Sequence, residues 1–468
     1  MTSREPAQNT AGQGNGKSLN QSLIESAQEF RDSIEALIEL AALVDDSARR
    51  LDDDKASFER RLLLAHPSLD DAGRLYERLI SKLESALQSA RRSRQNQTSS
   101  EEKTAPTNNE IAIEIDLSDL IEEYGLDLID SAMLTISRVR RARATVAFNS
   151  LLVAAVGEFE ALCYQCIKNF VRKYPAKLSS STKEFTFEEV NAFGDLDDFK
   201  AHAIDVYAEA IMRGSVDDWL KWFATNIKLQ SSDVTDDWDQ FFEIFQRRHL
   251  LVHNGGVVSR LYRKKVKILP DDIAATGPGL EPRAEVTRSY LQEALARLHV
   301  AGLLLAIRTS LCIEPPKRAT RPPSDPLIAD VSFEFLQQNR GRELLLFSDR
   351  ALPYCTEEGI RLLLQVNLWI QRKRDNGVES IRDEVTQWDV RHCSQRFEIA
   401  KFALLNMHRE TNELGKRLVA QDTLTQSEWD SWPLFEESRA WAEATSGTLQ
   451  ESQAAPEAEE GDEAMGRP

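Results

Sequence analysis

The segment Arg247-Arg248-His249-Leu250-Leu251-Val252-His253-Asn254-Gly255-Gly256 brings two arginines and two histidines close together in the sequence. Histidine exchanges a proton near neutral pH, and arginine holds phosphate through bidentate hydrogen bonds. On an ideal helix Arg248 lies about 140° round from His253, an angle that a long guanidinium can bridge. We therefore expect acid–base chemistry on a phosphate, with Arg248 and His253 as the catalytic candidates.

A helix expected over Asp236–Val252 positions these side chains. Its apolar residues give it a buried face, and Asn254-Gly255-Gly256 ends it, because glycine adopts the left-handed cap. His253 then lies in the last turn, one turn after His249. Glu243 precedes Arg247 by four residues, which predicts a surface ion pair. The supporting residues expected around the catalytic pair are Arg247, His249, Asn254 and Glu243.

A concentrated run of positive charge follows the helix, in a chain whose formal net charge is -18. No acidic residue lies between Arg247 and Lys267. A phosphate-rich ligand is the natural partner of such a run, although an ordinary solvated loop has the same composition. We expect the stretch from Gly255 to Pro282 to be irregular, with at most a short hairpin. The residues expected to bind RNA are Arg260, Arg263, Lys264, Lys265 and Lys267.

The arrangement resembles the HEPN superfamily, whose signature is Arg, a polar residue, a few further residues and then His. Here it reads Arg248, His249, three apolar residues and His253, with Arg247 before and Asn254-Gly255 after, as in many bacterial members. The resemblance is specific over residues 243–256 and extends as a helical pattern over 126–314. It implies a metal-independent endoribonuclease that works as a homodimer, with two Arg/His pairs meeting across the interface. It is also typical of toxins and anti-phage effectors, some controlled by a separately encoded antitoxin or nucleotidyltransferase partner.

The mechanism expected of such an enzyme needs no cofactor. His253 would take the proton from an RNA 2′-hydroxyl, which attacks the adjacent phosphate and leaves a cyclic phosphate end. Arg248 would stabilise the charge that develops in the transition state.

The Arg-to-His spacing alone is not specific. Arg61 and His66 have the same spacing, but His66 precedes Pro67 and neither a glycine cap nor a basic run follows. An alternative is a catalytically inactive HEPN-like scaffold that acts through its flanking helical domains.

The sequence also contains spacings typical of a metal site and of a redox-active cysteine pair. His249 and His253 have the spacing of metal ligands, but Leu250 stands where a zinc peptidase needs Glu, and no Cys or carboxylate cluster completes a shell. We therefore expect no metal. Cys163 and Cys166 have redox spacing, yet they lie within an apolar helical pattern, which indicates buried thiols.

The composition limits the class of protein. The chain has 468 residues, 41% hydrophobic and 29% charged, which suggests roughly two to four folded units. Five cysteines without regular spacing indicate reduced thiols and a cytoplasmic protein. The start is polar, so no signal peptide is expected. The apolar stretches Val146–Val156 and Leu298–Ile307 look too short to span a bilayer, so no membrane association is expected.

Helical periodicity predicts an all-α, multi-domain chain. Strong helical patterns cover Leu126–Tyr174, Phe187–Met212, Val216–Lys228 and Arg283–Cys312, and Pro67-Ser68 indicates a helix start with Ser68 as the cap. The expected divisions are a disordered leader (1–17), an N-terminal helical hairpin or coiled coil (18–95), a linker (96–125), the HEPN-like domain (126–314), a Pro-rich linker (315–327), a C-terminal helical domain (328–445) and a disordered acidic tail (446–468).

Overall fold

The computed structural model describes residues 18–49, 55–97, 115–180, 183–267, 273, 282–315 and 324–453. Within these ranges the regular structure is helical, and the one β-type pairing is an isolated antiparallel bridge between Val257 and Arg283. The predicted all-α class is therefore confirmed. The expected leader and most of the acidic tail lie outside the described residues, as does most of each expected linker.

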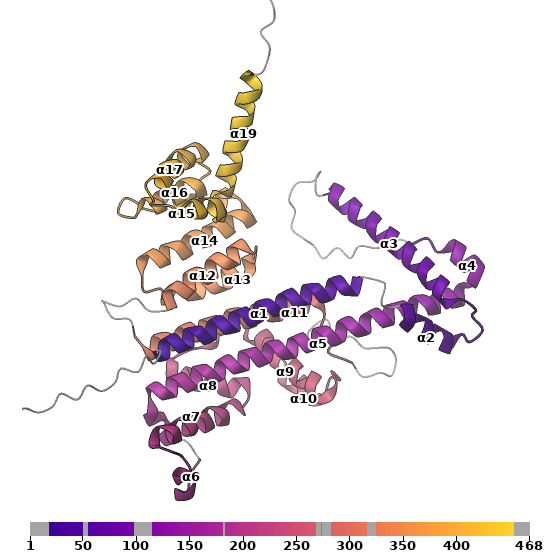
Figure 1. Cartoon of the computed structure of the whole chain (residues 1–468), viewed down its shortest axis with the longest axis horizontal. Helices are drawn as coiled ribbons and strands as arrows, with labels where there is room; N and C mark the ends of the chain where they lie inside the picture. The colour runs from indigo at the N-terminus through magenta and orange to yellow at the C-terminus, as the bar shows by residue number, and fades with distance from the viewer. Residues whose placement is uncertain are drawn as a thin grey trace, which may run out of the picture. The chain divides into compact units, whose positions relative to one another are not determined.

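The α-helices are named here in chain order (Figure 1). They are α1 (Leu19–Arg49), α2 (Lys55–Ala65), α3 (Ala72–Gln97), α4 (Ser118–Tyr124), α5 (Leu126–Lys173), α6 (Phe187–Asn191), α7 (Leu196–Met212), α8 (Val216–Ile227), α9 (Trp238–Asn254), α10 (Arg260–Lys265), α11 (Arg288–Ile313), α12 (Ser324–Gln337), α13 (Gly341–Ala351), α14 (Glu358–Asn376), α15 (Arg382–Gln387), α16 (Gln395–Leu404), α17 (His408–Ala420), α18 (Gln426–Ser431) and α19 (Glu436–Gln453).

Most helices lie where their periodicity predicts them, and α5, α8, α9 and α11 match the expected ranges closely. The pattern over 187–212 is an exception, because it forms two helices, α6 and α7. Asp195 separates them: its Oδ1 accepts hydrogen bonds of 2.8 Å from the backbone N–H groups of Asp197 and Asp198 and so caps α7.

The N-terminal region also differs from a simple two-helix hairpin. α2 and α3 pack against each other, while α1 is a separate long helix. α3 starts at Ala72, and its cap is Asp71, whose Oδ1 accepts from Arg74 N at 2.8 Å. The expectation that Ser68 caps this helix is therefore wrong. An aspartate directly before the first turn satisfies its N–H groups, whereas Ser68 lies too far upstream.

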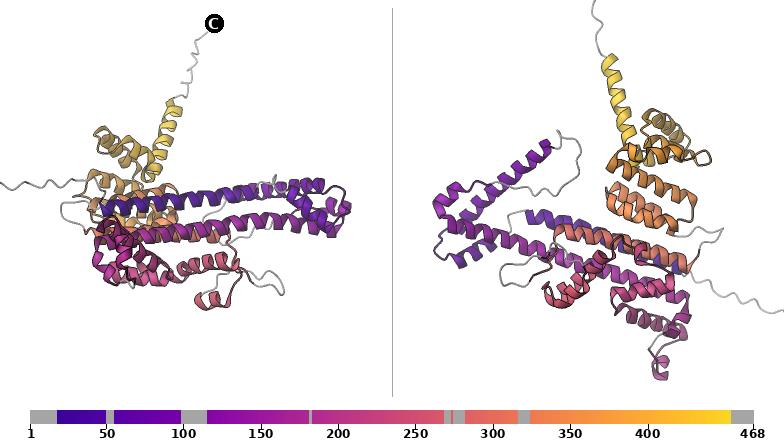
Figure 2. Two further views of the ribbon diagram at one scale, coloured as in Figure 1. Left: turned by 60° about the horizontal axis from the view of Figure 1, so that its bottom comes forward. Right: turned by 180° about the vertical axis from the view of Figure 1, so that it is seen from behind.

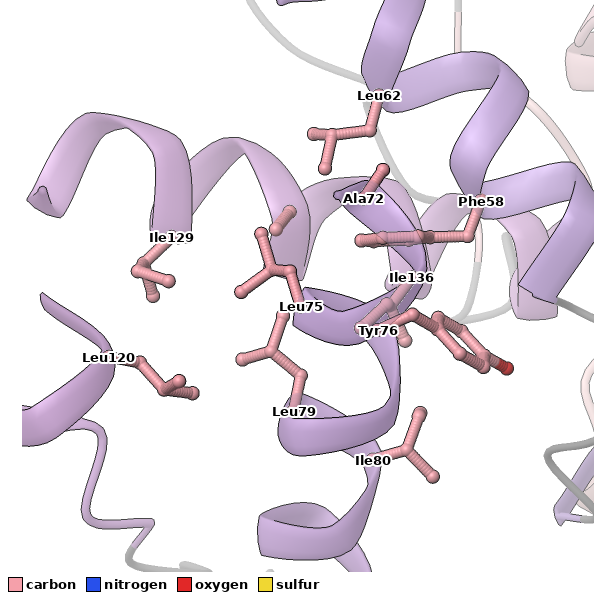
Figure 3. Close-up of a cluster of buried hydrophobic side chains, with 11 residues drawn as sticks. Phe58, Leu62, Ala72, Leu75, Tyr76, Leu79, Ile80, Leu120, Ile129 and Ile136 are labelled. Atoms are coloured by element: carbon pink, nitrogen blue, oxygen red, sulfur yellow. The ribbon is translucent and has the colours of Figure 1, made fainter. Parts of the chain in front are cut away.

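A compact apolar cluster joins α2, α3, α4 and the first turns of α5. Figure 3 shows Leu75 and Leu79 of α3 pointing towards Leu120 of α4 and Ile129 of α5. These four side chains are at most 2% exposed. α4 lies inside the expected linker of 96–125, and Leu120 is its contribution to this cluster.

The chain forms two compact units. One comprises residues 1–30, 160–238 and 299–468, and the other comprises residues 31–159 and 239–298. Helices α1, α5 and α11 each contribute residues to both units. The units thus combine distant segments, whereas the sequence suggests consecutive domains; that linear division stays a prediction. The candidate catalytic segment belongs to the unit of 31–159 and 239–298.

The C-terminal residues of the other unit form a helical assembly in which α12, α13 and α14 contact one another (Figure 1). Buried Asp325 of α12 accepts hydrogen bonds from the backbone N–H groups of Thr356 and Glu357 at 3.2 and 2.9 Å, just before α14 begins. Buried Asn367 of α14 donates to Ser332 of α12 at 3.1 Å and accepts from the Trp432 indole at 3.3 Å. These buried polar contacts hold specific helices together.

Two helices are long and apolar enough, by length and composition alone, to cross a membrane: Ala144–Lys173 and Arg288–Ile313. The apolar stretches seen in the sequence therefore extend further than expected. In Arg288–Ile313, 83% of the most apolar window is buried within the protein, as in the core helix of a soluble fold, against 39% in Ala144–Lys173.

Candidate functional site

Helix α9 carries the candidate catalytic residues, and its inner face is anchored by more than apolar contacts. Phe241, Ile244 and Phe245 are buried as predicted, but so are Glu243 and Arg247, which are 3% and 0% exposed. Arg247 Nε donates to Glu243 Oε1 at 2.8 Å. The predicted pairing is thus confirmed, while its expected place on the surface is wrong. The physical reason is that both side chains point inward, where other polar groups satisfy them.

Glu243 is the centre of a buried polar cluster that we call the Glu243 cluster, formed by Glu243, Arg247, Tyr262 and Tyr290. The Tyr262 hydroxyl, from α10, donates to Glu243 Oε1, and the Tyr290 hydroxyl, from α11, donates to Oε2 at 2.6 Å. The Arg247 guanidinium lies 3.7 Å from the centre of the Tyr290 ring and donates to the Glu285 carbonyl at 3.0 Å. The cluster ties α9, α10 and α11 together.

Ionisation of the two tyrosines is opposed by this environment. Burial and the neighbouring Glu243 carboxylate raise the pKa of Tyr262 and of Tyr290 well above the ordinary value. Both hydroxyls therefore stay protonated as donors to Glu243 over the physiological pH range.

The end of α9 has the expected glycine cap. Gly255 and Gly256 have φ angles of 56° and 82°, and Gly256 N donates to the Leu250 carbonyl at 3.1 Å. This hydrogen bond closes the end of the helix, and both glycines take the left-handed conformation that favours glycine. Asn254 Nδ2 donates to the Val257 carbonyl at 2.6 Å, so Asn254 stabilises the turn. His253 lies in the last turn, as predicted.

The chain after the cap is held in place by short backbone pairing. Val258 N donates to the Pro282 carbonyl and Ala284 N to the Gly256 carbonyl, each at 2.9 Å. The Arg283 guanidinium donates to the Gly255 carbonyl at 3.0 Å. The Val257–Arg283 bridge thus fixes the turn that follows His253.

His249 and His253 lie side by side on the exposed face of α9. Both are exposed, and their ring centres are 4.5 Å apart. Burial and the positive charges of His253, Lys265 and Arg248 lower the pKa of His249 below its ordinary value. At neutral pH this histidine is therefore held more in its neutral form than an isolated one.

The two histidines line a pocket of about 240 Å³ between the end of α9 and α10. Its other walls come from both helices and the turn between them. The lining residues are Gln246, His249, Leu250, His253, Asn254, Ser259, Leu261, Tyr262 and Lys265. The pocket combines two imidazoles with a lysine, a set of groups suited to an anionic ligand.

Arg248 is placed differently from the histidines. It is half-buried, and the residues that line the pocket do not include it. Its charge is nevertheless close enough to contribute to the lowered pKa of His249. The structure thus brings His249, His253 and Lys265 together, with Arg248 at the side of this group.

Residues 260–265 of the basic run form a helix, α10, where an irregular loop is expected over 255–282 (Figure 2). Residues 268–272 and 274–281 of that stretch lie outside the described residues. Ser259 caps α10 by accepting from Tyr262 N at 3.1 Å. Tyr262 and Val266 pack with Leu250, Val258 and Ala284, which fixes the helix against α9. One face is thereby buried, and the charged side chains stand on the other.

The predicted RNA-binding residues divide into two groups. Arg260, Arg263, Lys264 and Lys265 are exposed on α10. Lys267, just beyond the helix, is exposed but is paired with Asp239 of α9 at 2.9 Å. The fold thus brings the carboxylate of Asp239 next to a basic run that contains no acidic residue.

The second Arg-to-His copy lies in a different setting. His66, just after α2, is half-buried, and its Nε2 lies 3.0 Å from the Ser131 hydroxyl of α5. His66 and Arg61 therefore serve as matched controls for His253 and Arg248.

Other candidate chemistries can be located too. Cys163 and Cys166 are buried on α5, and burial raises the pKa of Cys166 to about 12, so the predicted core thiols are confirmed. Among the described residues, no three His, Cys, Asp or Glu side chains converge in the way that metal ligands do.

Two residues that matter were missed by sequence reasoning, Tyr262 and Tyr290. Ser259 directly before α10 is a capping residue that could have revealed this helix, but nothing local indicates that either tyrosine reaches Glu243. No protein-family model matches the chain, and no similar curated protein or solved structure is found. Function must therefore be inferred from the site itself.

Proposed function

We propose that this protein is a metal-independent endoribonuclease of the HEPN type, with its active site at the end of α9. The observation that carries the proposal is the pocket in which His249 and His253 face Lys265. A rigid glycine cap and the buried Glu243 cluster hold this end of α9, and exposed positive charge on α10 adjoins it. Such preorganised cationic surroundings favour a reaction that builds negative charge on phosphate.

The reaction is attack of an RNA 2′-hydroxyl on the adjacent phosphate. His253 transfers protons, and Arg248 stabilises the charge on the pentacovalent phosphate. Products carry a cyclic phosphate and a free 5′-hydroxyl. Exposed Arg260, Arg263 and Lys264 hold the flanking phosphates of the RNA strand.

The wider setting of the proposal comes from the resemblance to HEPN proteins. By this resemblance the protein is a cytoplasmic, multi-domain toxin or anti-phage effector that works as a homodimer. In such a dimer a second Arg/His pair from the partner protomer completes the surroundings of the phosphate. An antitoxin or nucleotidyltransferase partner would control it.

A second candidate is an inactive HEPN-like scaffold that acts through its flanking helical domains. The observation that favours it is the position of Arg248, which does not line the histidine pocket. A scaffold needs only the buried cluster and the packed helices, and it predicts no RNA cleavage.

The test is cleavage of total RNA by purified protein with and without a chelator. Arg248→Ala and His253→Ala should each lower the rate at least about a hundredfold, the scale of lost electrostatic or proton-transfer catalysis. Arg61→Ala and His66→Ala are the matched controls and should retain the wild-type rate. Chelator should not matter. Cleavage that persists in His253→Ala, or that chelator abolishes, would contradict the proposed mechanism.

A further inference from the structure

His249 and His253 share one pocket wall, which raises the question of what a second imidazole does there. Their ring centres are 4.5 Å apart, both rings are exposed, and Lys265 of α10 lines the same pocket. A structural role is a poor explanation, because an exposed histidine contributes little to packing. Two proton-transfer groups beside one phosphate are what a cyclising phosphodiester cleavage requires, since one oxygen loses a proton and another gains one.

We propose that His249 and His253 of the same chain form the complete acid–base pair of the reaction, with His249 as the base and His253 as the acid. This inference rests on the proposed function and deepens it, because it makes His249 a catalytic residue. It also reverses the role that the sequence suggests for His253.

The charges around His249 support this division. Arg248 and His253 on α9 and Lys265 on α10 all face His249, and the positive charge of each disfavours protonation of the His249 ring. These groups and partial burial lower the pKa of His249, so its neutral, proton-accepting form is favoured. His253 lies in the last turn of α9 and lines the same pocket, so it is the group left to act as the acid once His249 is the base.

The 2′-oxygen attacks phosphorus and gives its proton to neutral His249 as the O2′–P bond forms. The P–O5′ bond breaks, and the departing O5′ takes a proton from the His253 imidazolium. The products are a 2′,3′-cyclic phosphate and a 5′-hydroxyl. The two histidines end in opposite protonation states, and exchange with water restores them.

Lys265 and the pocket size indicate what binds. The volume of about 240 Å³ is below the roughly 300–1,000 Å³ of pockets that enclose drug-sized ligands. It therefore suits one phosphodiester group with its sugar. Lys265, on the α10 wall, neutralises that phosphate while the two imidazoles reach its oxygens from α9.

The decisive experiment changes the leaving group. The same RNA oligonucleotide is prepared with oxygen or with sulfur at the bridging 5′ position of the cleaved bond. A thiol, with a pKa of about 8.5, leaves without a proton, so the acid becomes dispensable. On the oxygen substrate, His249→Ala and His253→Ala should each lower the single-turnover rate about 10²–10⁴-fold. On the sulfur substrate, His253→Ala should recover to within about tenfold of wild type, whereas His249→Ala should stay defective.

The pH profile gives a second readout. With oxygen, the wild-type rate should rise as the base loses its proton and fall as the acid loses its own, which gives a bell. With sulfur, the alkaline fall should disappear, because no acid is needed. His249→Asn serves as a second variant, and circular dichroism checks that each variant is folded.

Mixing variants tests whether both groups come from one chain. His249→Ala mixed with His253→Ala should not recover activity, because every chain lacks one member of the pair. Recovery on mixing would place the acid and base on different chains and overturn the inference. The inference would also be overturned if His249→Ala cleaved at the wild-type rate. It would be overturned, too, if His253→Ala were as defective on the sulfur substrate as on the oxygen substrate. A wild-type protein that cleaves neither RNA would instead refute the proposed function, and the inference with it.

Discussion

Arg247 and Arg248 are neighbours with the same side chain, yet the fold gives them separate tasks. Arg247 is fully buried, pairs with Glu243 and lies over the Tyr290 ring. Arg248 is half-buried and contributes positive charge near His249. A buried arginine with these contacts serves the fold, so the proposed contact with phosphate is assigned to the half-buried Arg248.

This difference predicts opposite effects of one substitution. Arg247→Met removes the cation from a buried carboxylate and should destabilise the protein by about 3–5 kcal/mol. Arg248→Met should cost about 1 kcal/mol or less, because the Arg248 side chain is only half-buried. Urea unfolding of the two variants at pH 7 measures both. Equal losses of unfolding free energy would show that the Glu243 cluster does not anchor α9.

The residues of the site were predictable to different degrees. The place of His253 in the last turn and the glycine cap follow from local rules, and both are confirmed. The pairing of Glu243 with Arg247 follows from their spacing. Their burial could not be predicted, because it depends on Tyr262 and Tyr290, which come from other helices.

At the scale of elements, α10 shows why a short helix is not predicted from sequence periodicity. α10 is only six residues long, so it completes too few turns for its periodicity to stand out. Its composition therefore suggests a loop, although Ser259 provides a start signal. Tertiary packing of Tyr262 and Val266 stabilises a helix that would be marginal alone.

The bond from Tyr262 to Glu243 links α10 to α9 and makes stability depend on alkaline pH. The folded protein raises the pKa of Tyr262, whereas the unfolded chain loses that proton near pH 10. The stabilisation is thus fully present below about pH 10 and is lost as pH rises further, by up to about 1.4 kcal/mol per pH unit.

Tyr262→Phe should remove the part of this dependence that Tyr262 contributes, while Tyr290 keeps its own part. The variant should be less stable than wild type at pH 8 by about 1.5–3 kcal/mol, the contribution of a hydrogen bond to a charged group. The difference should shrink as pH rises from 9 to 11, measured by urea unfolding at each pH. Stability curves that stay parallel over this range would contradict the assigned bond.

At the scale of the whole molecule, sequence periodicity predicts the helices but not which helices pack together. The all-helical character is confirmed, and so are the positions of α5 and α11. Periodicity marks which face of a helix is apolar but not which distant helix covers it. The two compact units each combine separated segments, such as 31–159 with 239–298, and no local signal in the chain indicates this.

The proposed cleavage of RNA through its 2′-hydroxyl at the end of α9 can be tested with a single 2′-deoxy substitution. An RNA oligonucleotide cut by the purified protein is compared with the same strand carrying a single 2′-deoxy residue at the cut position. The all-ribose strand should give cyclic phosphate ends, and the substituted strand should lose that one cut, because the nucleophile is absent. Cutting of the substituted strand at the same position would show that the 2′-hydroxyl is not the nucleophile.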